Sequence, residues 1–201
     1  MGIEFKKKAV AGRFPEIWRG ECKVLPGGFK PIGNYPVGTV IRRGAPLYVD
    51  FATRNAAVCK TAVVVNGGTT TAPRVAKGHY FAPGDSVAVS GGATAVSVVS
   101  VTTDNEGYDV ITFNKALTGV KADDILINAA DEAVDGKFAP KYAPNMIVSA
   151  DKEFKGHGID TLDAGYDAMV ITPSLASTPM LDEWLSGIFL KQNPNIMFIT
   201  Q

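Results

Sequence analysis

The sequence lacks the long hydrophobic runs that membrane proteins and secreted precursors carry. Its longest uninterrupted apolar runs are four or five residues, as at residues 62–65, far short of the roughly 20 that a membrane-spanning helix needs. The first 14 residues hold three lysines with no apolar segment behind them, so they do not form a signal peptide. We therefore expect synthesis in a cytoplasm and no membrane partner.

Cysteine and histidine are both scarce, which leaves little material for redox, metal or triad chemistry. Cys22 and Cys59 have neither CxxC nor CxxH spacing, which favours free thiols. His79 and His157 are far apart in sequence, and each is expected to be a surface or hydrogen-bonding side chain. No GxSxG, HExxH or GxxxxGK[ST] motif occurs, so we expect no catalytic residues, no metal and no cofactor.

Two groups of acidic residues are candidates for ligand or catalytic sites. Asp104, Glu106 and Asp109 form one group, and three aspartates between residues 160 and 167 form the other. Neither matches the twelve-residue calcium loop with its terminal glutamate. A pair of acids for glycoside hydrolysis depends on separation in space, so a small hydrolase stays open as a minor alternative.

What the chain does contain is the composition of an ordered protein and many short strand-like segments. Its 201 residues are 46% hydrophobic and 20% charged, enough to bury a core in one domain or two small ones. Residues 79–128 alternate Val/Ile/Thr/Phe runs with Gly-rich turns, which predicts a β-meander. Within it, the phase of alternation shifts by one residue at Val98 and Val99, indicating either two buried faces or a β-bulge.

The fold class expected is mainly β, a barrel or sandwich of short antiparallel strands, with one C-terminal helix (α+β overall). Further strands are expected near residues 37–49, 57–65, 146–148 and 168–172, and a closing strand at 195–200. Residues 179–191 predict an amphipathic helix, because Thr178 suits the N-cap and Pro179 the first turn, and apolar residues recur at helical spacing. We divide the chain into an arm (1–36), a β-rich core (37–128) and an α+β region (129–201) packed on that core or beside it.

The N-terminal 36 residues are rich in Gly and Pro but also carry several large apolar side chains. Exposing such side chains forgoes about 1.5 to 3 kcal/mol of burial free energy each, so we expect an extended arm that docks on a partner surface. Aromatic and arginine residues dominate stable interfaces. The predicted interface residues are Phe5, Arg13, Phe14, Trp18, Arg19 and Phe29.

Charge is distributed unevenly along a chain whose formal net charge is zero. Residues 1–60 hold 11 Lys and Arg against 4 acids, a net of +7, whereas residues 101–201 hold 7 Lys against 15 acids, a net of −8. Such polarity fits docking on an acidic protein surface or between copies of the chain, or two solvated faces of no special role. Nucleic-acid binding is disfavoured, because the basic residues are not interleaved with aromatics in an RNP-like pattern.

Residues 37–127 resemble the head fiber or head decoration proteins of tailed bacteriophages, especially those infecting Bacteroides and its relatives. The resemblance lies in a G-x-P-L start, a Cys-Lys-Thr-Ala strand, a PRV-x-KGH-x-F segment, a GD-x-V turn and a D-x-I-x-F strand. The NPNIMFI ending is also similar. These motifs are structural, so the resemblance assigns no catalytic residue.

The resemblance implies a non-enzymatic virion protein on the outside of a capsid, with the major capsid protein and other copies of itself as partners. It would be made in the host bacterial cytoplasm and end on the particle surface. A compact knob is expected rather than a long shaft, because the sequence has no internal repeat and no sustained heptads. The main alternative is a carbohydrate- or ligand-binding β module.

Overall fold

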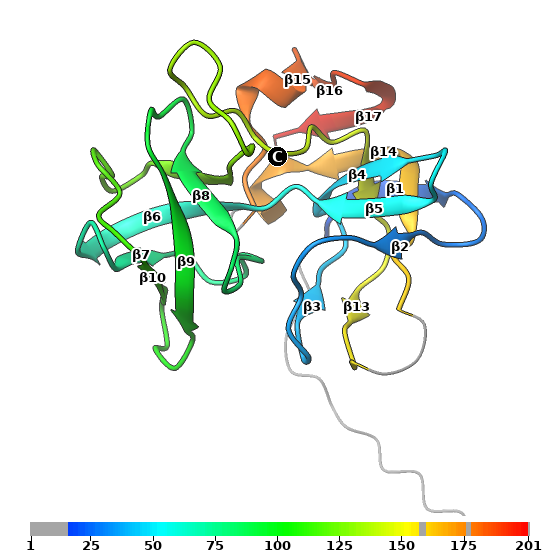
Figure 1. Ribbon diagram of the computed structural model, residues 1–201. Helices are drawn as coiled ribbons and strands as arrows, with labels where there is room; N and C mark the ends of the chain where they lie inside the picture. Colours follow the sequence, from blue (N-terminus) through cyan, green and yellow to red (C-terminus); the bar gives the residue numbers. More distant parts are fainter. Residues whose placement is uncertain (1–15, 157–159, 176–177, 201) are drawn as a thin grey trace, which may run out of the picture.

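The computed structural model describes residues 16–156, 160–175 and 178–200, which form two β-sheet units that share a boundary (Figure 1). One unit is a closed barrel and the other is a nine-stranded sheet. A small ribbon of β3 (Val40–Ile41) and β13 (Lys152–Glu153) extends from the sheet side. The mainly β architecture expected from the sequence is confirmed. No helix among the described residues is long and apolar enough to cross a membrane.

Six antiparallel strands close the barrel in the order β10-β7-β6-β11-β8-β9. They are β6 (Thr61–Gly68), β7 (Pro73–Val75), β8 (Ser86–Val89), β9 (Ala95–Thr102), β10 (Asp109–Phe113) and β11 (Ile125–Asn128). Inward-facing side chains such as Val64, Val87, Val98, Ile111 and Leu126 fill the interior. The meander expected within residues 79–128 is β8, β9 and β10, whereas β11 leaves it to pair with β8 and β6.

A β-bulge at Val99 explains the phase shift in β9. Thr112 pairs with Ser100 and Phe113 pairs with Val98, so Val99 has no partner on β10. Its side chain is 55% exposed, while Val98 points into the barrel. Of the two interpretations left open by the sequence, the bulge is the one that the structure adopts.

The nine-stranded sheet is built around one long strand, β14. Its strands are β1 (Trp18–Val24), β2 (Lys30–Pro31), β4 (Pro46–Asp50), β5 (Asn55–Val58), β12 (Met146–Val148), β14 (Ala164–Ile171), β15 (Leu185–Ser186), β16 (Phe189–Leu190) and β17 (Asn193–Ile199). One edge of β14 pairs with β1, and its other edge pairs first with β12 and then with β17. The expected closing strand is therefore confirmed as β17.

Barrel and sheet share one hydrophobic cluster. Ala88 of β8 and Ile127 of β11 contribute to it from the barrel, and Ile147 of β12 contributes from the sheet. Trp184, which is 4% exposed, lies in the same cluster. The two units are thus parts of one packed body, with β5 leading directly into β6 between them (Figure 1).

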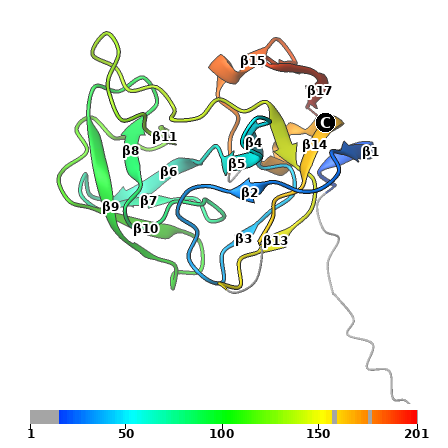
Figure 2. The same ribbon diagram turned by 45° about the vertical axis from the view of Figure 1, so that its right-hand side comes forward.

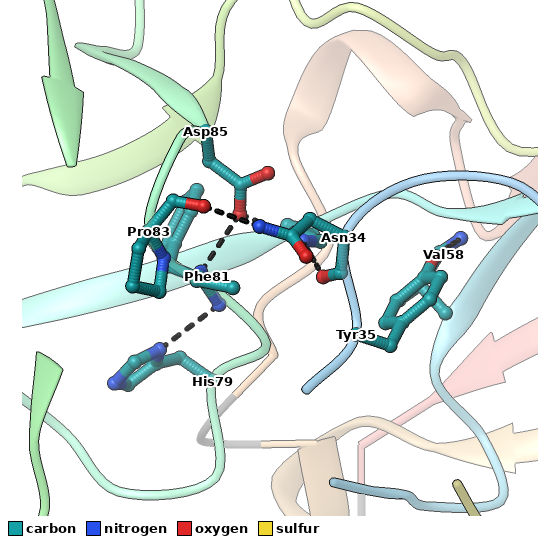
Figure 3. Close-up of polar contacts among 9 residues, drawn as sticks. Asn34, Tyr35, Val58, His79, Phe81, Pro83 and Asp85 are labelled. Atoms are coloured by element: carbon teal, nitrogen blue, oxygen red, sulfur yellow. Dashed lines mark hydrogen bonds and ion pairs between the residues drawn. The ribbon is translucent and has the colours of Figure 1, made fainter. Parts of the chain in front are cut away.

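A buried polar contact reinforces this boundary, and Figure 3 shows Asp85, Asn34 and Pro83, which take part in it. Lys60, between β5 and β6, places its Nζ 2.7 Å from Oδ2 of Asp85, which precedes β8. The same ammonium donates to the backbone carbonyl of Asn34, 2.8 Å away, in the loop after β2. The Asn34 side-chain amide in turn donates to the carbonyl of Pro83. Three segments distant in sequence are held together at one buried charge pair.

The helix predicted over residues 179–191 is wrong. The segment contains one short 3-10 turn, η2 (Asp182–Trp184), and then the β15–β16 hairpin; the other 3-10 turn is η1 (Thr172–Leu175). Gly187 turns this hairpin at a φ of 64°, a conformation that glycine adopts without steric cost. The helical spacing did identify buried side chains such as Leu181 and Trp184, but strand pairing with β17 determines the backbone.

From Glu16 onward, the predicted N-terminal arm is part of the fold. β1 pairs with β14 and β2 pairs with β5, so residues 16–36 are not an extended arm. The expected unit of residues 37–128 is also divided, because β4 and β5 belong to the sheet together with strands from residues 129–201. Residues 1–15 lie outside the described part of the chain.

Candidate functional site

The predicted interface residues fall in three different places. Phe29 is 1% exposed and packs in the sheet's core, so it is not a free anchor for a partner. Trp18 and Arg19 are both on β1. Phe5, Arg13 and Phe14, like His157, lie outside the residues that the structure describes.

Trp18 fastens β1 to the sheet rather than projecting from it. It pairs with the fully buried Val170 and packs, half-buried, against the cluster that the sheet shares with the barrel. The guanidinium carbon of Arg43 lies 5.8 Å from the centre of its ring, a cation–π contact. The indole is therefore committed to holding the edge strand in place.

A bulge in β1 brings its second half back onto β14. Arg19 pairs with Met169 and Lys23 pairs with Asp167, so Gly20 to Cys22 form three residues against one on β14. Gly20, at a φ of 72°, permits the bulge. Lys23 then forms an ion pair with Asp167, with Nζ 2.6 Å from Oδ2.

The register of the sheet aligns four side chains in one row across its outer face. Arg19 of β1 pairs with Met169 of β14, Met169 pairs with Met197 of β17, and Met197 pairs with Phe189 of β16. Directly paired residues project to the same face of a sheet. We call Arg19, Met169, Met197 and Phe189 the Met169 row. Strands β1, β14 and β17, which carry the first three, lie at the end of the molecule away from the barrel (Figure 2).

Burial alternates along β14, β16 and β17, as expected for a sheet that has one face in the core and the other toward solvent. Val170, Ile196 and Leu190, on the inner face, are 0%, 0% and 1% exposed. Met169 is 39% exposed, and Met197 and Phe189 are only half-buried. Methionine, aromatic and arginine side chains are enriched at protein interfaces, and methionine adapts its shape to a partner. The outer face thus has the chemistry of a docking surface.

The free edge of β1 is poorly suited to receive an added strand. Within the described residues β1 pairs only with β14, so its other edge is open. That edge is interrupted by the bulge at Gly20 and carries the charged residues Arg19, Glu21 and Lys23, features that discourage edge-to-edge pairing. Docking through the outer face is therefore favoured over strand addition.

The fold brings some charges of the basic front and the acidic back of the chain into contact. Strands from the basic front and the acidic back are neighbours in one sheet, so their charges meet: Lys23 pairs with Asp167, and Arg42 pairs with Asp151 at 3.0 Å. These pairs are solvent-exposed and contribute little stability. Basic and acidic residues that are far apart in the sequence are therefore in contact at these two places.

Both thiols are free, as expected, and neither is poised for reaction. Burial, with the Asp167 carboxylate adding to it, raises the pKa of Cys22 to about 11. Burial also raises the pKa of Cys59. Both therefore stay protonated at neutral pH, which removes them as nucleophiles. No cluster of three or more His, Cys, Asp or Glu with metal-binding geometry occurs among the described residues.

Comparisons of this chain with protein-family models, with curated proteins and with solved structures find no match. The sequence had singled out Arg19 but missed Met169, Met197 and Phe189. A signal for the two methionines was present, because NPNIMFI and DAMVI each place one methionine between two other apolar residues. The pairing of these two segments was not visible in the sequence.

Proposed function

We propose that this chain is a structural protein of a tailed-bacteriophage particle, a head fiber or decoration protein that sits on the outside of the capsid. It is non-enzymatic in this proposal, and its partner is the major capsid protein. The resemblance of residues 37–127 to such proteins supports the class of function. The Met169 row supports the place of contact.

The single observation that carries the proposal is the half-exposed apolar row on a rigid, one-sided sheet. Removing apolar surface from water contributes about 25 cal/mol per Å², so covering two methionines and a phenylalanine favours association. Arg19, at the β1 end of the row, forms an ion pair with Glu16 at 3.0 Å and so places charged groups at its rim, where charges set orientation and specificity more than affinity. The row is presented by β14, which is hydrogen-bonded on both edges and thus fixed in position.

We expect copies of the chain to associate with each other on the particle, because a repeated surface protein occupies symmetric sites. The Met169 row is assigned to the capsid in this proposal, not to a second copy. A symmetric dimer that buries the row in solution would reassign it. Size measurement by light scattering at several concentrations distinguishes the two arrangements, since a dimer formed through the row would be disrupted by Met169→Glu.

The proposal is tested on purified particles of the phage that encodes the chain. Mass spectrometry should find the chain in heads at a fixed ratio to the major capsid protein, and cross-linking should join residues on β1, β14 or β17 to that protein. Absence of the chain from purified heads would overturn the proposal. Cross-links from the barrel alone would keep the chain in the virion but move the contact elsewhere.

A further inference from the structure

A cleft separates the barrel from the segment that joins β2 to β3. Its volume is about 650 Å³, within the roughly 300 to 1,000 Å³ typical of small-molecule sites. One wall is residues 36–42 with β3, and the other is residues 78–83 together with the ends of β9 and β10. The cleft is thus bounded by both folding units, the position in which ligand sites are commonly found.

A fixed carboxylate lines this cleft. Asp109, at the start of β10, has a side chain that is 8% exposed. Its Oδ1 is 2.9 Å from Nζ of Lys77, and its Oδ2 is 3.4 Å from Nε2 of His79. The carboxylate therefore carries a compensated charge and is held in one orientation, which suits an acceptor for ligand hydroxyl groups.

His79 lines the same cleft with an unused hydrogen-bond donor. Its Nδ1 accepts the backbone N–H of Phe81 at 3.1 Å (Figure 3), so in the neutral ring the proton is on Nε2. The side chain is 3% exposed, and burial lowers the pKa of His79 to about 4. Among the described residues, Nε2 is the one buried side-chain nitrogen or oxygen without a hydrogen-bond partner, because its 3.4 Å contact with Asp109 lacks hydrogen-bond geometry.

The rest of the lining offers neutral polar groups and small apolar surfaces. The hydroxyls of Thr39, Ser100 and Thr103 make no side-chain hydrogen bond within the described part of the chain. Val37, at 73% exposure, and Val101 supply apolar contact. Arg42 is already paired with Asp151. No uncompensated charge remains to select a phosphate or a carboxylate.

We propose that this cleft binds a neutral saccharide unit of a glycan. Sugar hydroxyls donate and accept at the same time, which matches a carboxylate acceptor beside serine and threonine hydroxyls. The C–H faces of a sugar ring match the valine surfaces. His79 lies beside Asp109, which Lys77 holds in position, and a small shift of the ring or carboxylate lets Nε2 donate to a bound hydroxyl. The assignment does not rest on capsid docking, because no residue of the Met169 row lines the cleft.

The experiment is a screen of the purified full chain on an array of neutral, sialylated and sulfated oligosaccharides, followed by titration of the best neutral binder by NMR. The variant Ser100→Trp fills the cleft from an exposed position of β9. Ser97→Trp is the matched control, because Ser97 is also exposed on the same strand but does not line the cleft. Thr103→Ala removes one hydroxyl without adding volume.

The expected result is binding of a neutral oligosaccharide, with amide shifts at Gly38, Ser100 and Thr103. Ser100→Trp should weaken that binding at least tenfold, Thr103→Ala should weaken it several-fold, and Ser97→Trp should leave it unchanged. Three results would each overturn the proposal: no neutral oligosaccharide bound at millimolar concentration, binding restricted to sialylated or sulfated glycans, or equal losses in Ser100→Trp and Ser97→Trp.

Discussion

Lys60 and Asp85 form an ion pair at the boundary of barrel and sheet, with 2.7 Å between Nζ and Oδ2 and only 2% and 8% of their side chains exposed. Burial lowers the pKa of Lys60, and attraction to the Asp85 carboxylate opposes that effect. Asp85 also accepts the backbone N–H of Ala82 at 2.8 Å. Such a pair adds little net stability, but breaking it leaves one charge buried without a partner.

Replacing Lys60 alone should therefore be costly. Lys60→Met is expected to lower the free energy of unfolding by about 3 to 5 kcal/mol, because Asp85 is left buried and unpaired. The double variant Lys60→Met/Asp85→Asn should lose less stability than the sum of the losses of the two single variants. Urea denaturation measures both. Lys141→Met, which breaks the exposed Lys141–Asp131 pair, is the control and should cost at most about 1 kcal/mol; equal losses at the two sites would contradict the account.

The buried imidazole of His79 should make stability depend on pH in a defined window. Its pKa is about 4 in the folded protein against an ordinary 6.5, so the unfolded chain binds the proton more readily between these values. The stabilisation is complete above about pH 6.5 and is lost as the pH falls toward 4, by about 3 kcal/mol in total. Asp109 and Asp85 oppose the shift, whereas Lys60 and Lys77 add to it.

Urea denaturation of the wild type and His79→Gln at pH 7, 5.5 and 4.5 checks this expectation. The difference between the two proteins isolates His79, because every other titratable group is present in both. The wild type should lose more stability than the variant between pH 7 and 4.5. Parallel losses would show that His79 does not carry the effect.

Substitution of Phe29 tests whether this predicted interface residue belongs to the core instead. Phe29→Ala should destabilise the protein by about 3 to 5 kcal/mol, the usual cost of emptying a buried aromatic site. Phe51, whose ring meets that of Phe29 edge-on at 6.1 Å, is 56% exposed, and Phe51→Ala should cost much less. Thermal unfolding compares them. If Phe29→Ala kept full stability but lost capsid binding, Phe29 would be an interface residue after all.

Truncation tests whether residues 16–30 are part of the fold. Deleting residues 1–30 removes β1 and Phe29, so the shortened chain should not fold, and its loss of capsid binding would carry no information. Deleting residues 1–15 leaves every described strand in place and should give a folded protein. Circular dichroism and a cooperative thermal transition check both deletions; a stable 31–201 fragment would contradict the role assigned to β1.

Substitution of Gly165 tests how closely β1 packs on β14. A Cβ at Gly165 would lie 2.4 Å from Sγ of Cys22 and 3.2 Å from Cγ1 of Ile147. Gly165→Ala should therefore cost about 1 to 3 kcal/mol through overpacking. Adding Cys22→Ala removes the nearer obstacle and should recover part of the loss. If Gly165→Ala cost as much stability in the Cys22→Ala background as in the wild type, β1 would not pack on β14 as described.

Local patterns in the sequence predicted much of the fold, because they report local physics. Alternation located the strands of the barrel, and the slip at Val98 and Val99 correctly indicated a bulge. The error over residues 179–191 arose because i, i+3, i+4 spacing is satisfied equally by a 3-10 turn followed by a hairpin. Gly187 was the available warning, since glycine costs about 1 kcal/mol relative to alanine inside a helix.

Pairings between distant segments were not predictable in this way. The Gly- and Pro-rich N-terminal segment looked like an arm because its strand partner, β14, is more than 140 residues away. For the same reason, the charge polarity suggested separate faces, although Lys23 and Asp167 are in contact. The Met169 row depends on the register of four strands, three of them from the last 40 residues, and register is set by tertiary structure.

The central claim is that the Met169 row docks on the capsid, and cosedimentation with heads prepared without the chain tests it most directly. Met169→Glu and Met197→Glu should fold normally, because their side chains are on the outer face, yet each should weaken binding at least about tenfold, or 1.4 kcal/mol. Val99→Glu, at the exposed bulge of the barrel, should bind like the wild type. Full binding by the two methionine variants, or an equal loss in Val99→Glu, would contradict the claim.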